Sequence, residues 1–198
     1  MENRPGPPGT MPPTVLLLPG IGNSGPRHWQ SVWERSDDRF RRVEPLDWDR
    51  PERGAWVAGL ERAVRAAGPD AMVVAHSLGC LAVAHWAVGP RSPVRAVMLV
   101  AAPDPAGPAF PAEATGFAPL PERPLGLAGL VVVSDDDPYA TPSHAERMAA
   151  AWGLEVARIG AAGHVNSESG LGPWPQGLAL LDRLVAGPAC AAGPGKRR

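Results

Sequence analysis

The sequence contains only two cysteines, Cys80 and Cys190, in 198 residues. So few thiols exclude a disulfide-rich scaffold and a zinc site built from cysteines. None of the five histidines is spaced from acidic residues or cysteines in the way that metal ligands are. Cys80 lies in an apolar run and is interpreted as a small core residue, whereas Cys190 lies in a tail rich in glycine, proline and alanine. The sequence therefore predicts no metal site.

The chain also lacks an excess of positive charge and a long hydrophobic segment. Nineteen basic and twenty acidic residues give a formal net charge of −1, which excludes the basic face that nucleic-acid binding requires. No apolar run reaches the roughly 18 residues of a membrane span. Residues 1–13 are rich in proline and glycine and have no apolar core of a secretory signal. We therefore expect a cytoplasmic location, with no nucleic-acid partner and no membrane.

Strand and helix patterns alternate along most of the chain. The length fits one domain with a substantial core, predicted over residues 14–186 between disordered segments at 1–13 and 187–198. Strands are predicted at 14–18, about 42–45, 71–75, 94–101, 130–133 and 154–159, and helices at 52–67, 78–88, 142–152 and 175–185. Such alternation predicts an α/β fold in which helices cover both faces of a parallel sheet. Its ligand site should lie at the carboxyl ends of the strands.

The most informative motif follows the third predicted strand, at Ala75-His76-Ser77-Leu78-Gly79. A serine between small residues, at a sharp turn from a strand into a buried helix, is typical of the nucleophile elbow of α/β-hydrolases. The usual pattern has glycine at both small positions, and Ala75 is the smallest departure from it. Ser77 could instead simply cap the following helix. The motif indicates a catalytic serine only if an acid and then a histidine follow it along the chain.

An acid follows the strand predicted at 130–133, in the run Asp135-Asp136-Asp137-Pro138. An acidic turn of this kind is also common in solvent-exposed loops. Asp137 is our preferred acid because it directly precedes Pro138, and Asp136 is the alternative. His164 is the histidine that follows a later strand, through the flexible turn at residues 160–163. Ser77, Asp137 and His164 therefore occur in the order and at the strand ends that a Ser-Asp-His triad requires.

A glycine-rich loop at residues 20–25 follows the first predicted strand. It has neither the Gly-Lys-Ser/Thr ending of a phosphate-binding loop nor a G-x-G-x-x-G pattern. In the hydrolase interpretation, such a loop supplies one backbone N–H of an oxyanion hole, and the residue after the nucleophile supplies another. The candidate donors are Ile21 and Leu78.

Four segments together resemble the retinoblastoma-binding protein 9/YdeN type of small serine hydrolases, within the α/β-hydrolase superfamily. They are residues 18–29, 75–80, 134–139 and 163–175, and the likeness extends from about residue 14 to about residue 185. The resemblance implies a compact hydrolase of about six strands without a cap domain, with Ser77, Asp137 and His164 as its triad. It names no natural substrate. Some members bind a protein through Leu-x-Cys-x-Glu, but here Leu78-Gly79-Cys80 is followed by Ala82 in place of the glutamate, so the protein partner is unknown.

The predicted reaction is the hydrolysis of a small-molecule ester, thioester or amide through an acyl-enzyme, which needs no metal or organic cofactor. Trp29, Trp33, Trp48 and Trp174 lie near loops that should flank the site, and Trp29 and Trp174 are our candidates for substrate binding. Core packing is the alternative for each. The segment at 103–124, rich in proline and glycine, could line the pocket through Phe110 and Phe117 or simply pack on the surface. A catalytically silent protein-binding module on the same fold is the alternative function.

Overall fold

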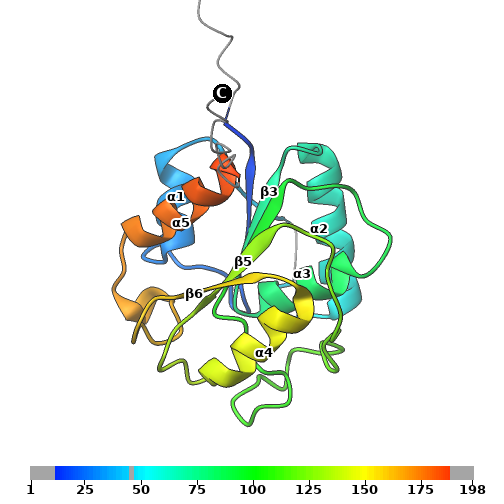
Figure 1. Cartoon of the computed structure of the whole chain (residues 1–198), viewed down its shortest axis with the longest axis vertical. Helices are drawn as coiled ribbons and strands as arrows, with labels where there is room; N and C mark the ends of the chain where they lie inside the picture. Colours follow the sequence, from blue (N-terminus) through cyan, green and yellow to red (C-terminus); the bar gives the residue numbers. More distant parts are fainter. Residues whose placement is uncertain (1–11, 45–46, 188–198) are drawn as a thin grey trace, which may run out of the picture.

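The computed structural model describes residues 12–44 and 47–187, and within them a single parallel sheet runs through the centre of the molecule (Figure 1). Its six strands follow the order β2-β1-β3-β4-β5-β6. They are β1 (Val15–Leu18), β2 (Phe40–Arg42), β3 (Met72–His76), β4 (Ala96–Val100), β5 (Gly129–Val133) and β6 (Glu155–Arg158). The predicted α/β class and strand number are confirmed. The expected disordered segments, 1–13 and 187–198, lie almost wholly outside the described residues.

Helices cover both faces of the sheet, as Figure 1 shows. On one face lie α1 (Trp29–Ser36) and α5 (Pro175–Ala186), and on the other α2 (Arg53–Ala67), α3 (Leu78–Ala87) and α4 (Pro142–Trp152). Successive side chains of a strand point to opposite faces. Val15 and Leu17 therefore enter the core beneath α1 and α5, whereas Leu16 and Leu18 enter the core beneath α2, α3 and α4. This two-sided burial explains why the central strands are apolar throughout.

The helix signals in the sequence correspond to observed ends. The side chain of Thr141 caps α4 by accepting a hydrogen bond from the backbone N–H of His144 at 3.2 Å, and Pro142 takes the first helical position. Gly153 ends α4 in the left-handed conformation, with φ of 71°. Every predicted helix is present within a residue or so of its predicted bounds.

Two details of the prediction are wrong. The predicted helices do not include α1. Its cap is His28, whose imidazole accepts a hydrogen bond from the N–H of Gln30, and histidine is not among the usual capping residues. Strand β2 was placed around residues 42–45 but ends at Arg42. Its register follows from parallel pairing of Phe40 with Val15, a contact between distant residues that local sequence does not reveal.

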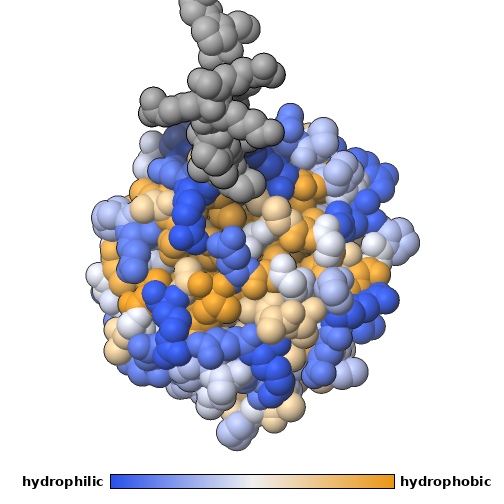
Figure 2. All heavy atoms as spheres, in the orientation of Figure 1, coloured by the Kyte–Doolittle hydropathy of each residue, from blue (hydrophilic) through white to orange (hydrophobic). Residues whose placement is uncertain are grey.

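The segment after β4 has no helix or strand of its own between residues 101 and 128. Phe110 reaches the cavity beside Ser77, whereas Phe117 is buried against Trp56, with ring centroids 6.0 Å apart. The segment therefore both lines the site and packs on the core, and it forms no cap domain. The face in Figure 2 carries hydrophobic residues at its centre with hydrophilic residues around them. No helix among the described residues is long and apolar enough to cross a membrane.

Candidate active site

Ser77 occupies a strained turn between β3 and α3. Its φ of 52° and ψ of −126° are unusual for a residue with a side chain, at a cost of about 1–3 kcal/mol. The turn is held by the N–H of Ser77, which donates to the carbonyl of Val100 at 2.9 Å, and by the N–H of Cys80, which donates to the carbonyl of Ser77 at 2.9 Å. This is the backbone geometry that the elbow motif predicts.

Glycines make this elbow possible by allowing two chain segments to touch. A Cβ on Gly79 would lie 2.6 Å from the carbonyl oxygens of Leu18 and Pro19. A Cβ on Gly20 would lie 2.8 Å from the Cβ of Ser77. The loop after β1 is thus packed directly against the serine, which is where a donor to an oxyanion must stand. Ala75, which replaces the first glycine of the usual motif, is fully buried in β3.

The three residues predicted from the sequence lie in hydrogen-bond contact. Nε2 of His164 is 2.8 Å from Oγ of Ser77. Nδ1 of the same ring is 2.9 and 3.0 Å from the two carboxylate oxygens of Asp137. With the proton on Nδ1 donated to Asp137, Nε2 is free to accept the proton of the serine hydroxyl. All three side chains are largely buried.

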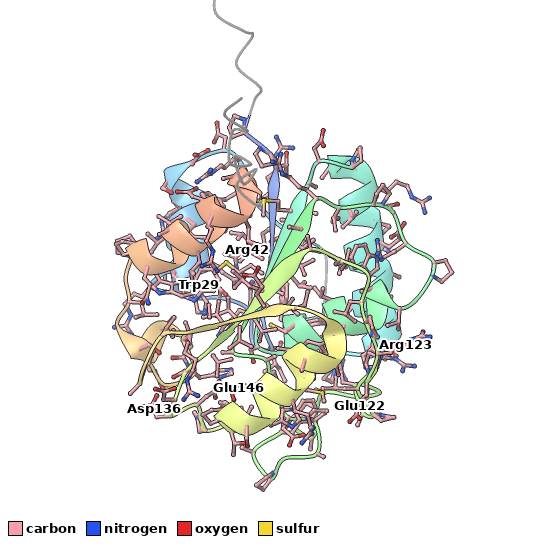
Figure 3. All side chains as sticks on the ribbon, viewed as in Figure 1. Trp29, Arg42, Glu122, Arg123, Asp136 and Glu146 are labelled. Atoms are coloured by element: carbon pink, nitrogen blue, oxygen red, sulfur yellow. The ribbon has the colours of Figure 1, made fainter. Side chains whose placement is uncertain are left out.

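The three consecutive aspartates have different contacts, which separates the two acids that sequence reasoning left open. Asp135 pairs with Arg158 on the surface. Asp136 accepts hydrogen bonds from Oγ of Ser134 at 2.9 Å and from the N–H of Gly163 at 2.7 Å. Asp136 thus holds the loop that carries the histidine, and Asp137 alone of the three contacts the imidazole. Figure 3 shows Asp136 at the end of the sheet, beyond β5.

Two further histidines stand beside the predicted triad, and sequence reasoning gave neither a role. Nε2 of His76 donates to the backbone carbonyl of His164 at 2.9 Å, so the elbow supports the loop of the third residue. The ring of His28 meets that of His76 edge-on, with centroids 4.7 Å apart. Burial, together with the neighbouring histidines, lowers the pKa of His76 well below its usual value. The position of His76 inside the elbow motif was the available signal.

A cavity of about 350 Å³ opens beside Ser77. Ile21, Leu78 and Phe110 form an apolar part of its wall, and Asn166, Ser167 and Glu168 form a polar part. Both residues expected to supply oxyanion donors, Ile21 and Leu78, therefore line the cavity. Among the described residues, no group of three or more His, Cys, Asp or Glu side chains could hold a metal ion.

Trp29 and Trp174 do not line this cavity, which corrects their predicted role in substrate binding. They are 1% and 2% exposed, and their rings pack against each other with centroids 4.9 Å apart. The indole N–H of Trp29 donates to the carbonyl of Val165 at 2.8 Å. Trp29 is the first residue of α1, and Figure 3 shows it in the interior of the molecule, on the side of α5. These tryptophans support the loop of His164 from behind, in the core.

Comparisons with known proteins identify the family and the fold. The family model for serine hydrolases matches residues 15–183. No curated protein matches the chain. A solved structure described as a YdeN-like hydrolase from Pectobacterium atrosepticum is 31% identical, with a TM-score of 0.78, covering 87% of this chain and 90% of that one. The ydeN gene product of B. subtilis is 18% identical, with a TM-score of 0.72 and coverage of 88% and 99%. The type II thioesterase BorB, from the borrelidin biosynthetic cluster, is 16% identical, with a TM-score of 0.61 and coverage of 92% and 95%.

Proposed function

Because this chain belongs to the serine hydrolase family, we propose that it hydrolyses small esters, thioesters or amides through an acyl-enzyme on Ser77. The observation that carries the proposal is the continuous contact from Asp137 through His164 to the serine hydroxyl. Few other roles explain a strained serine placed 2.8 Å from an imidazole that is itself oriented by a carboxylate.

The reaction follows from this arrangement. His164 takes the proton of Ser77 as Oγ attacks the carbonyl carbon of the substrate, and Asp137 stabilises the imidazolium that results. The tetrahedral intermediate collapses when His164 gives that proton to the leaving group. Water then attacks the acyl-enzyme, with His164 again as base, and releases the acid. We assign the oxyanion to the backbone N–H groups of Ile21 and Leu78, at about 3–4 kcal/mol for each donor.

The cavity supports small acyl groups as substrates. Its volume of about 350 Å³ must hold both the acyl chain and the reacting carbonyl. Its apolar wall is limited to the side chains of Ile21, Leu78, Pro103, Ala109, Phe110 and Pro111. Each buried methylene contributes about 0.8 kcal/mol to binding only as far as apolar wall is available. Short acyl chains should therefore be the preferred substrates.

Labelling with a fluorophosphonate tests the proposal, since this reagent phosphonylates an activated serine. Mass spectrometry should place the adduct on Ser77, and Ser77→Ala should remove both the adduct and the hydrolysis of p-nitrophenyl acetate. Ser167→Ala is the matched control, because Ser167 lines the same cavity but makes no side-chain hydrogen bond to a histidine among the described residues. Labelling on another residue, or unchanged turnover in Ser77→Ala, would refute the proposal. An unlabelled, inactive protein would favour the silent binding module.

A further inference from the structure

The loop after β1 carries Ile21, the proposed oxyanion donor, at the centre of a tight turn. The N–H of Asn23 closes this turn by donating to the carbonyl of Gly20 at 3.2 Å. The backbone N–H of Ile21 has no backbone acceptor among the described residues, so it is available to an oxyanion. An oxyanion donor is effective only when it is held in place before the charge develops. The side chains that hold this loop therefore affect the reaction rate.

Gln30, the second residue of α1, is completely buried and binds both ends of this loop. Its Oε1 accepts a hydrogen bond from Oγ of Ser24, at the far end, at 2.7 Å. Its Nε2 donates to the carbonyl of Leu18, the last residue of β1 before the loop, at 3.3 Å. The same nitrogen donates to the carbonyl of Val74 at 3.3 Å, in the strand that leads to Ser77. One amide group thus connects the oxyanion loop to the strand of the nucleophile.

The partners of Gln30 require an amide at this position. Two of the three are backbone carbonyls, which can only accept, so the nitrogen of Gln30 must face them. Its oxygen then faces Ser24, whose hydroxyl must donate. An amide side chain carries two donor hydrogens and an acceptor oxygen at one end, which matches this set. A buried polar network whose members are all satisfied fixes one arrangement of the groups that it joins.

The backbone of Ser24 is also held from a second direction. Its carbonyl accepts hydrogen bonds from Oγ of Ser31 at 2.8 Å and from the guanidinium of Arg42 at 3.1 Å. The side chain of Arg42 is 8% exposed and forms an ion pair with Glu34 at 2.6 Å, so its own position is fixed. The far end of the loop therefore stays attached when the hydroxyl of Ser24 is removed. This makes Ser24→Ala a mild test of the contact with Gln30.

We propose that Gln30 is a positioning residue, which sets the N–H of Ile21 at the place beside Ser77 that the oxyanion requires. Gln30 does not line the cavity and acts only through the loop. The oxyanion exists in the transition state and not in the bound substrate, so a loosely held donor lowers kcat and leaves KM unchanged. This inference rests on the proposed hydrolase function and adds a residue that supports its oxyanion hole.

Two variants and one control test the role of Gln30. Gln30→Met keeps the length of the side chain and removes all three hydrogen bonds, whereas Ser24→Ala removes one of them. Ser92→Ala is the matched control. The hydroxyl of Ser92 also donates to a side-chain oxygen at 2.7 Å, that of Glu61, and neither of these residues lines the cavity. Tm is measured for each protein, so that a loss of stability can be separated from a loss of rate.

The readouts are kcat and KM for p-nitrophenyl acetate and the inhibition constant of a short alkyl trifluoromethyl ketone. Oγ of Ser77 adds to the carbonyl carbon of this ketone, the serine proton passes to His164, and the carbonyl oxygen becomes an oxyanion. We expect kcat to fall about three- to tenfold in Ser24→Ala. It should fall further in Gln30→Met, towards the roughly 10²–10³-fold that the loss of a whole oxyanion donor costs.

KM should stay within about twofold of the wild-type value, because acylation and deacylation both pass through an oxyanion and are slowed together. The inhibition constant should rise by about the factor by which kcat falls, since the bound ketone carries the same oxyanion. In Ser92→Ala, both kcat and the inhibition constant should stay within about twofold of wild type.

Three results would overturn the role of Gln30 while leaving the hydrolase function intact. One is an unchanged kcat in Gln30→Met or, if that variant does not fold, in Ser24→Ala. Another is a lower kcat with a wild-type inhibition constant, because the oxyanion donor would then be in place. The third is an equal fall of kcat in Ser92→Ala and Ser24→Ala, which would assign the effect to stability alone. Absence of fluorophosphonate labelling on Ser77 of the wild-type protein would instead overturn the proposed function, and this inference with it.

Discussion

Lowering the pH from 8 to 5 should destabilise this protein through His28. The ring is buried without a charge, and its pKa falls from 6.5 to about 4 in the folded state. Between these two values the unfolded chain holds a proton that the folded chain does not. Stability therefore rises with pH in this window, is fully present above about 6.5, and is lost as the pH falls towards 4.

The size of the effect follows from the two pKa values. At pH 5 the unfolded imidazole is almost fully protonated and the folded one is mostly neutral. The difference amounts to about 2 kcal/mol relative to pH 8, and rises to about 3 kcal/mol near pH 4. His28 is only 4% exposed, so solvent screening removes little of it. His76 adds an effect of the same sign, because burial lowers its pKa as well.

Urea unfolding followed by tryptophan fluorescence measures this directly in the wild-type protein and in His28→Asn. The variant keeps the cap of α1 but has no titrating ring. Its loss of unfolding free energy between pH 8 and pH 5 should be smaller by about 2 kcal/mol. His28 also contributes to lowering the pKa of His76, so its removal can only make the loss in the variant smaller still. If both lose the same free energy, His28 does not titrate as the structure requires, and the reasoning fails.

Three further changes probe the site. Gly20→Ala brings a Cβ to 2.8 Å from the Cβ of Ser77. The kcat for p-nitrophenyl acetate should therefore fall sharply, while the circular dichroism spectrum remains that of the wild type. A wild-type kcat in this variant would contradict the packing of Gly20 against Ser77. Asp137→Asn should lower kcat by a factor of about 10⁴, because the imidazole then adopts the wrong tautomer. Asp136→Ala removes the hydrogen bond to Gly163, so it should lower Tm and reduce kcat far less. If Asp136→Ala reduced kcat more than Asp137→Asn, the two acids would be misassigned. Rates on p-nitrophenyl esters should peak at short chains and fall by the octanoate, and an optimum at long chains would mean that the cavity extends further than its apolar wall.

The sequence predicted those features that depend on neighbouring residues. The elbow at Ser77 needs an apolar strand, small flanking residues and a buried helix, and all of these are contiguous. The choice of Asp137 over Asp136 depended on its position before Pro138, and the structure places only Asp137 against the imidazole. The placement of all three residues at strand ends followed from the alternation of strands and helices, because ligand sites of parallel sheets lie at the carboxyl ends of the strands.

Features that depend on contacts between distant residues could not be predicted from the sequence. Trp29 is bound to the carbonyl of Val165, 136 residues further along the chain, so its burial cannot be read from its loop-like surroundings. The same holds for His28, whose capping role made α1 invisible to the usual signals. A tryptophan close to a predicted site in the sequence is therefore weak evidence that it lines the pocket, because it can equally be buried in the core.

The contact between the loop after β1 and the elbow has a consequence for how this site can evolve. Neither Gly20 nor Gly79 leaves room for a methyl group. The loop that carries Ile21, the proposed oxyanion donor, and the turn that carries Ser77 therefore cannot be changed independently of each other. The opposite walls, around Phe110 and Ser167, come from loop segments, and Phe110 and Ser167 are themselves partly exposed. New specificities should therefore arise by substitution and insertion in those two segments, and libraries for altering the substrate range are best confined to them.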